Sequence, residues 1–339
     1  MPMNVRQETY DTYWVFAARR QEAFFNRLKN RPQPWTSDPI IEEYKFCNTY
    51  RASDRVSQFL IRNVIYQGSQ NEEEVVFRTL LFKIFNKIET WQFLEDRLGS
   101  ITVGGFSFER YCSILQEAMD AGNAIYTSAY MSCASKAFGY DRKHHNHLKL
   151  IEKMVVDDRI AAKILRTRSL EEVYKSLLAY PLIGKFMAYQ LAIDLNYSEV
   201  IDFDENDFTV AGPGAERGIR KCFVDTGGRS HTDIIRWMES RQEIEFERLG
   251  IQFPSLWERR LHLIDCQGLF CETDKYSRVA FPELKSNRVR IKARFAPNPQ
   301  PIDYFYPPKW HLNDKVAVTT AEREQDTPPG RMQLTLAGV

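Results

Sequence analysis

A glycine-bearing turn followed at a fixed distance by acidic residues constrains this chain more than any other feature. The turn, residues 181–184 (PLIG), lies between two helical patterns, and Asp204 follows Gly184 by twenty residues at the start of an acidic run, 204–207. A helix that begins at such a turn leaves backbone N–H groups without partners, and these groups bind phosphate. The segment therefore predicts a helical hairpin that holds an anion near a carboxylate, although an ordinary helix-turn-helix with an acidic surface loop has the same pattern.

Helical periodicity extends along most of the chain, and the 43% apolar content of its 339 residues is sufficient for a core. The pattern predicts an all-α fold of two helical lobes with a cleft and few or no strands, 288–294 being the best strand pattern. We expect one domain over 1–295, with the helical hairpin region at about 169–223, and a Pro-rich extended tail over 296–339. The expected helices are 8–30, 40–67, 71–97, 107–119, 144–156, 157–165, 169–179, 184–196, 214–223, 230–249 and 254–270.

The charge and cysteine patterns exclude several classes of protein. The net charge is only +1, so positive charge for an anionic partner has to be concentrated locally. The six cysteines form no CxxC pair and the histidines lack ligand spacing, so no metal site is predicted. Without a long apolar run or a signal-peptide core, we expect a soluble, cytoplasmic protein that does not bind a membrane.

A second glycine turn opens another predicted helix and is followed by cations. Residues 212–221 read GPGAERGIRK, which is neither a Walker motif nor a dinucleotide fingerprint. Glycine turns often have purely structural roles, but N–H groups and cations together suit phosphate or pyrophosphate. The predicted pyrophosphate-binding residues are Gly212, Gly214, Arg217, Arg220 and Lys221.

The acidic run between the two turns is the predicted source of a catalytic base. Such clusters are usually solvated loops, but like charges this close raise one another's pKa, which suits proton transfer. Asp204 and Asp207 are the principal catalytic candidates, with Glu205 beside them.

Two further sets of polar residues are candidates for binding. Residues 265–278 are densely polar, which fits either recognition of a small zwitterion or a salt-bridged helix end. The predicted amine- or substrate-binding residues are Asn206, Gln190, Asp265, Gln267, Glu272, Lys275 and Arg278. Aromatic and basic residues near the N-terminus suit base stacking and phosphate contacts. The predicted DNA-binding residues are Arg19, Arg20, Trp35, Arg51, Arg55, Gly184 and Lys185.

The first turn and Asp204 resemble the helix-hairpin-helix and catalytic-aspartate segment of the DNA glycosylase superfamily. Leu182 replaces the first turn glycine, and Phe186 stands where lyase-type members carry a reactive lysine, so the resemblance does not imply Schiff-base strand cleavage.

Three longer blocks resemble the alpha-glutamyl/putrescinyl-thymine pyrophosphorylase family, the phage amino acid:DNA transferases. The blocks are YWVFAARRQEAFF with PWTSDPIIEEYKFCNTYRASDRVSQFLI, FMAYQLAIDLNYS with DFDENDFTVAGPGAERGIRKCF, and LIDCQGLFCETDKYSRV. This resemblance covers roughly residues 8 to 285 and implies a glycosylase-like helical fold.

The resemblance also implies an activity. A flipped 5-hydroxymethyluracil in DNA, pyrophosphorylated by a separate kinase, would exchange pyrophosphate for an amine from an amino acid, glycine favoured, or a polyamine. Mg²⁺ on the pyrophosphate is compatible with this reaction, but no residue pattern requires it. If phage-encoded, the protein would act in the host cytoplasm. A monofunctional DNA glycosylase and a non-enzymatic DNA-binding module are the alternative hypotheses.

Overall fold

The computed structural model describes residues 2–127, 134–291, 293–298 and 300–325, and these residues are predominantly helical. The predicted all-α class is therefore confirmed. In the described residues the one sheet has two short antiparallel strands, β1 (Asn4–Val5) and β2 (Phe223–Asp225). No helix of the described part is long and apolar enough to cross a membrane.

The helices follow one another with short connections. In chain order they are α1 (Gln7–Leu28), α2 (Pro39–Glu43), 3₁₀ η1 (Arg51–Ser53), α3 (Arg55–Phe59), π-helical η2 (Leu60–Ile65), α4 (Glu72–Phe85), α5 (Ile88–Leu98), α6 (Phe108–Asp120), α7 (Lys143–Glu152), π-helical η3 (Lys153–Asp157), α8 (Ile160–Ile164), α9 (Leu170–Leu178), α10 (Lys185–Leu195), α11 (Pro213–Cys222), α12 (His231–Ser240), α13 (Gln242–Arg248), α14 (Leu263–Ala280), 3₁₀ η4 (Pro308–Trp310) and α15 (Asn313–Gln325).

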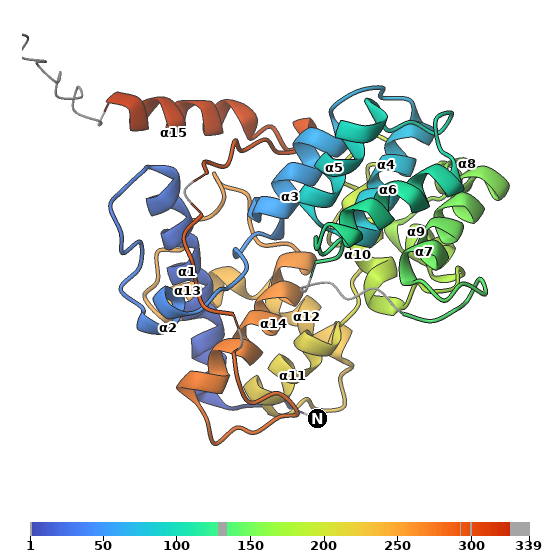
Figure 1. Ribbon diagram of the computed structural model, residues 1–339. Coiled ribbons are helices and arrows are strands. Elements are labelled where there is room, and N and C mark those ends of the chain that lie inside the picture. Colours follow the sequence, from blue (N-terminus) through green and yellow to red (C-terminus); the bar gives the residue numbers. More distant parts are fainter. Residues whose placement is uncertain (1, 128–133, 292, 299, 326–339) are drawn as a thin grey trace, which may run out of the picture.

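The helices form two groups, which correspond to the two expected lobes. Helices α1, α2 and α11–α14 come from the two ends of the sequence and pack together, whereas α4–α10 form the second group (Figure 1). The segment of η1, α3 and η2 connects the groups, with η1 against α14 and η2 against α4. The cavity described below is lined by residues of α1, α2 and nearby segments, so it lies in the first group and not between the two groups.

Local signals explain where several helices begin and end. The Asp38 side chain accepts hydrogen bonds from two backbone N–H groups of α2, and Pro39 follows it, as the sequence predicts. Asn71 caps α4 in the same way. The predicted helix 71–97 is split because Asn86 adopts a left-handed backbone, with φ of 49°.

Further expectations differ from the structure. The predicted helix 40–67 is divided into α2, η1, α3 and η2, and the predicted helix 230–249 into α12 and α13. The predicted helix 254–270 is displaced to α14, because Trp257 and Glu258 have positive φ and form a turn first. The predicted strand at 288–294 is reduced to an isolated bridge between Tyr44 and Arg294. The region 296–339 is not uniformly extended, since it contains α15 and a fully buried Tyr306.

Helices α9 and α10 form the helical hairpin expected around the first turn. Leu182, at the position of the missing glycine, keeps a left-handed backbone with φ of 66°. Gly184 is the N-cap of α10, and no side chain caps its free N–H groups. Gly184 and Lys185 are both exposed, so the start of α10 is open to a ligand.

Candidate functional site

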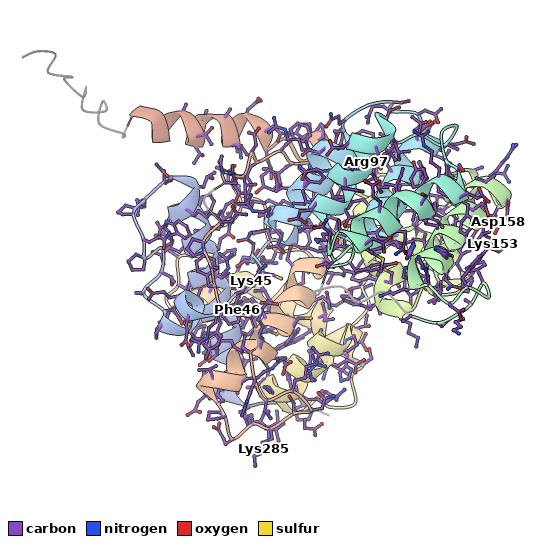
Figure 2. All side chains as sticks on the ribbon, in the orientation of Figure 1. Lys45, Phe46, Arg97, Lys153, Asp158 and Lys285 are labelled. Atoms are coloured by element: carbon purple, nitrogen blue, oxygen red, sulfur yellow. The ribbon has the colours of Figure 1, made fainter. Side chains whose placement is uncertain are left out.

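Helix α14 organises the candidate site because its two sides contact different elements. One side, with Cys271 and Asp274, packs against α11. The other side, with Glu272 and Lys275, meets the segment after α2. Figure 2 shows Phe46 of this segment beside the orange α14, and the ammonium of Lys275 lies 4.6 Å from the centre of its ring. Residues distant in sequence are thus assembled around one helix.

The glycines of the second turn have a packing role. A Cβ atom added at Gly218 would lie 2.1 Å from the carbonyl oxygen of Phe270, and one at Gly214 would lie 2.8 Å from the Cys271 sulfur. One at Gly212 would lie 2.7 Å from the Phe186 ring. Helix α11 can therefore approach α14 this closely only because these positions lack side chains.

A cluster of three cations around one buried carboxylate lies on the seam between α11 and α14. Asp274 is fully buried, and its oxygens lie 2.9 Å from Arg217, 2.7 Å from Arg278 and 3.2 Å from Lys221. Burial alone would raise the pKa of Asp274, but the hydrogen bonds from Arg278 and Arg217 outweigh it and lower the pKa. The carboxylate is therefore ionised, and the four groups carry a net charge of about +2.

Arg220, the other cation expected to bind pyrophosphate, faces solvent instead. It pairs with Glu216 one turn earlier at 2.9 Å, and both side chains are exposed. A pair of this kind contributes little to stability. The structure thus brings Arg217 and Lys221 together with Arg278 and separates Arg220 from them.

The acidic run lies at the N-terminal end of α14. Asp204 and Asp207 are exposed, whereas Glu205 is buried and pairs with Arg259 at 2.8 Å. The side-chain oxygen of Asn206 accepts a hydrogen bond from the first N–H group of α14 at 3.1 Å. This end of the helix is therefore capped by the run itself.

The acidic run and the cation cluster do not share one site. Asn206 contacts α14 at Leu263, whereas the cations gather around Asp274, eleven residues further along the helix. At 1.5 Å per residue this is roughly 16 Å along the axis. Asp204 and Asp207 are therefore not placed to take a proton from a group that Arg217 holds.

Asp265 is buried at the same end of α14. It accepts hydrogen bonds from the backbone N–H groups of Arg51 and His262, at 3.2 and 3.1 Å. Burial, with the nearby charge of Glu205 added, raises its pKa to about 7. Gln267, two residues further along, is also buried and touches Cys271 rather than solvent.

Arg51 and Gln190 belong to a buried network at the junction of the two helical groups. The Arg51 guanidinium donates to Gln190 at 2.9 Å, to the Tyr197 hydroxyl at 2.9 Å and to Asp194 at 2.6 Å. Lys83 pairs with the other oxygen of Asp194 at 2.8 Å. Arg51 was expected to grip DNA, but here its side chain joins the two groups, and breaking such a buried pair typically costs about 3–5 kcal/mol.

The segment after α2 contacts the other side of α14 through Cys47. The Cys47 side chain is exposed, and desolvation raises the pKa of its thiol well above the usual value. Glu272 accepts a hydrogen bond from the Cys47 backbone N–H at 3.0 Å and pairs with Lys275 at 2.9 Å. Asp54 is also near, and burial raises its pKa to about 6.

A cavity of about 240 Å³ lies beside this segment and is lined by Phe46 and Asn48 among others. Its walls come from α1, the segment after it, α2 and the chain following α14, and six of the sixteen lining residues are aromatic. The lining residues used below are Arg20, Phe24, Trp35, Tyr44, Asn48 and Tyr304. Two residues expected to contact DNA, Arg20 and Trp35, thus lie together in this cavity.

The other residues expected to bind DNA are dispersed. Arg19 is half-exposed and pairs with Asp38 at 2.8 Å. Arg55 donates to the backbone carbonyl of Gln300 at 2.6 Å. Gly184 and Lys185 remain accessible at the start of α10, and Phe186 places this turn directly beside Gly212 of the second turn.

Sequence reasoning did not single out Asp54, Cys47 or Asp274 as functional. Asp274 had one usable signal, its i,i+4 spacing to Arg278 on a helix. Asp54 and Cys47 had none, because the Arg20 and Glu272 charges that act on them are distant in sequence.

The chain matches the family described as "5-hmdU DNA kinase, helical domain" over residues 7–286. The 5-hmdU DNA kinase of Bacillus phage SP10 is 29% identical over 290 residues, which cover 80% of this chain and 45% of that kinase. The chain therefore spans less than half the length of this relative. No solved structure shows significant similarity to the chain. Since the match extends over most of its length, the chain belongs to the family of 5-hmdU DNA kinase helical domains.

Proposed function

We propose that this protein takes part in the hypermodification of 5-hydroxymethyluracil in DNA, as a transferase that replaces pyrophosphate on the modified base with an amine. Membership of the helical-domain family and the phage kinase relative support a role in this chemistry. The three sequence blocks that resemble amino acid:DNA transferases support the reaction type. The fold would be glycosylase-like, with α9 and α10 as its DNA-binding hairpin.

The cation cluster on the α11–α14 seam is the observation that carries the proposal. Arg217, Lys221 and Arg278 share a single carboxylate, and Arg217 retains 16% of its side-chain exposure. An excess of positive charge in a partly desolvated site stabilises a multiply charged leaving group most strongly as its charge develops.

The hairpin turn would hold the DNA strand. Gly184 and Lys185 present N–H groups and a cation to a phosphate, and Phe186 contacts the start of α11. A strand held there would lie beside the start of α11.

The reaction needs one proton acceptor. The amine nitrogen attacks the exocyclic methylene carbon as the C–O bond breaks, pyrophosphate leaves with the electron pair, and the ammonium proton passes to a carboxylate. No carboxylate of the described residues is assigned this role, because Asp204 and Asp207 lie toward the N-terminal end of α14 and Glu272 lies on the side of the helix opposite the cation cluster. Lys275 and the Arg278 side chain would orient a donor carboxylate. Mg²⁺, if used, would accompany the pyrophosphate.

The test is direct. The protein is incubated with DNA that contains pyrophosphorylated 5-hydroxymethyluracil and with glycine, glutamate, serine or putrescine in turn, and the digested nucleosides are identified by mass. A base heavier by the amine, together with released pyrophosphate, supports the proposal. Unchanged nucleosides with every donor would contradict it, and free base release would indicate a glycosylase.

A DNA-presenting module without catalysis is the second candidate. The observation that favours it is the relative itself, in which the matching region is less than half of a kinase. In that case the chain would bind 5-hydroxymethyluracil DNA, yield no product with any amine, and accelerate phosphorylation when a kinase is added in trans.

A further inference from the structure

Arg20 is a cation without a partner inside the aromatic cavity. It forms no hydrogen bond or ion pair with any residue in the described part of the chain, and desolvation lowers its pKa. Asp54 is near enough to act on it electrostatically but not to pair with it. The Arg20 guanidinium is partly exposed and its donors are unused by the described residues, so it is available to a ligand that supplies acceptor oxygens.

The walls of the cavity are suited to a flat ring. Phe24, Trp35, Tyr44 and Tyr304 line it with aromatic side chains, and the Arg27 guanidinium lies 5.3 Å from the centre of the Trp35 ring. The volume of about 240 Å³ lies just below the usual range for drug-sized ligands, about 300–1,000 Å³, so the cavity suits a small planar group.

One polar residue of the wall complements Arg20. The Asn48 amide nitrogen donates to the backbone carbonyl of Ser53 at 2.8 Å, which leaves the side-chain oxygen as an acceptor. An arginine donor and an amide acceptor in one aromatic slot match the edge of a uracil ring, which carries two carbonyl oxygens on either side of an N–H group.

We propose that this cavity receives the pyrimidine base when it turns out of the DNA strand, with Arg20 donating to a ring carbonyl and Trp35 stacking on the ring. This inference rests on the proposed function for the identity of the nucleic acid. Lys29 and Arg31 are exposed cations just after α1, between the lining residues Arg27 and Gln33 in sequence, and would contact the flanking phosphates.

The experiment compares two single-stranded oligonucleotides that differ at one position, 5-hydroxymethyluracil or an abasic analogue, by fluorescence anisotropy with the full chain. Wild type should bind the base-containing strand roughly tenfold more tightly, as expected for stacking on an aromatic residue. Arg20→Ala and Trp35→Ala should reduce this ratio to within about twofold. Trp35→Phe should largely restore it.

Arg31→Ala is the matched control, because Arg31 is exposed and its guanidinium bonds only to the Asn26 side chain in the described part. Loss of a phosphate contact should weaken both strands equally and leave the ratio unchanged. Thermal melting confirms that each variant is folded. Equal binding of the two wild-type strands, or an Arg20→Ala protein that keeps its preference, would overturn the proposal.

The two proposals fail separately. A tenfold preference for the base-containing strand, without any amine product, would support the base-binding cavity and contradict the transferase activity. Formation of the amine product, together with an Arg20→Ala variant that keeps the wild-type binding ratio, would support the transferase activity and contradict the base-binding cavity.

Discussion

Both ends of α14 carry clustered charged residues, but the burial and pairing of these residues differ between the ends. At the N-terminal end Asp204 is exposed, Glu205 pairs with Arg259 inside the protein, and the neighbouring Asn206 caps the helix. Near the C-terminal end a buried carboxylate is outnumbered by three cations. At the N-terminal end the buried charge of Glu205 is neutralised by Arg259. Near the C-terminal end the cluster keeps an excess of positive charge that an anionic ligand can neutralise.

Charged residues that are close in sequence therefore need not belong to one site. The acidic run and the cations of α11 lie within twenty residues of each other. However, α11 packs along α14 through Gly214 and Gly218, and this carries Arg217 away from the acids. The residues that do meet Arg217 come from α14 itself.

Replacement of the buried carboxylate of Asp274 should have the largest effect on the free energy of unfolding. Asp274→Asn leaves three cations without a counter-charge, and we expect a loss of about 3–5 kcal/mol in the free energy of unfolding. Asp204→Asn, at the exposed end, should change it by less than about 0.5 kcal/mol. Urea denaturation measures both, and similar losses at the two positions would remove the contrast between the ends.

The seam between α11 and α14 gives the next effect. Gly218→Ala places a methyl group against the Phe270 backbone, so the helices must separate at a cost of about 1–3 kcal/mol or more. Gly268→Ala is the control, because this position is inside α14 and has no atom within 4 Å of the added carbon. It should stabilise by about 0.5–1 kcal/mol. Thermal unfolding that ranks the two variants in the opposite order would refute the close-packing account.

Asp265, at the N-terminal end of α14, should make the stability of the protein depend on pH. Its pKa is about 7 in the folded protein and near 3.8 when unfolded, so between these values the folded state holds a proton that the unfolded state has lost. Stability therefore falls as pH rises from about 4 to about 7 and is constant above.

Asp265→Asn should flatten this decline, and the gain over wild type at pH 8 relative to pH 4 should be on the order of 1–3 kcal/mol. Denaturation midpoints measured across this range test the effect. Parallel profiles for the two proteins would show that Asp265 does not titrate as described.

Local patterns were enough to predict helices whose ends depend on neighbouring residues. Asp38 with Pro39 marks the start of α2, and the apolar stripe of α1 gives its bounds to within two residues. The start of α14 was missed, since the turn at Trp257 and Glu258 uses positive φ in residues that do not favour it.

The candidate site was less predictable. The cations of α11 were found because a glycine turn precedes them, but their carboxylate partner Asp274 lies on another helix. Arg51 was predicted to contact DNA from its residue type, but its guanidinium is buried and donates to Gln190 and Asp194. Side-chain environment is a tertiary property, and neither residue type nor spacing encodes it.

The most direct test of the central claim compares two arginines of α11 that lie three residues apart. Turnover of pyrophosphorylated 5-hydroxymethyluracil DNA with a saturating amine is measured for Arg217→Ala, in the cation cluster, and Arg220→Ala, in the exposed pair with Glu216. The cluster account predicts that kcat/KM falls roughly a hundredfold for Arg217→Ala and stays within about twofold of wild type for Arg220→Ala. Equal losses in the two variants, or full activity in Arg217→Ala with its fold intact, would contradict it.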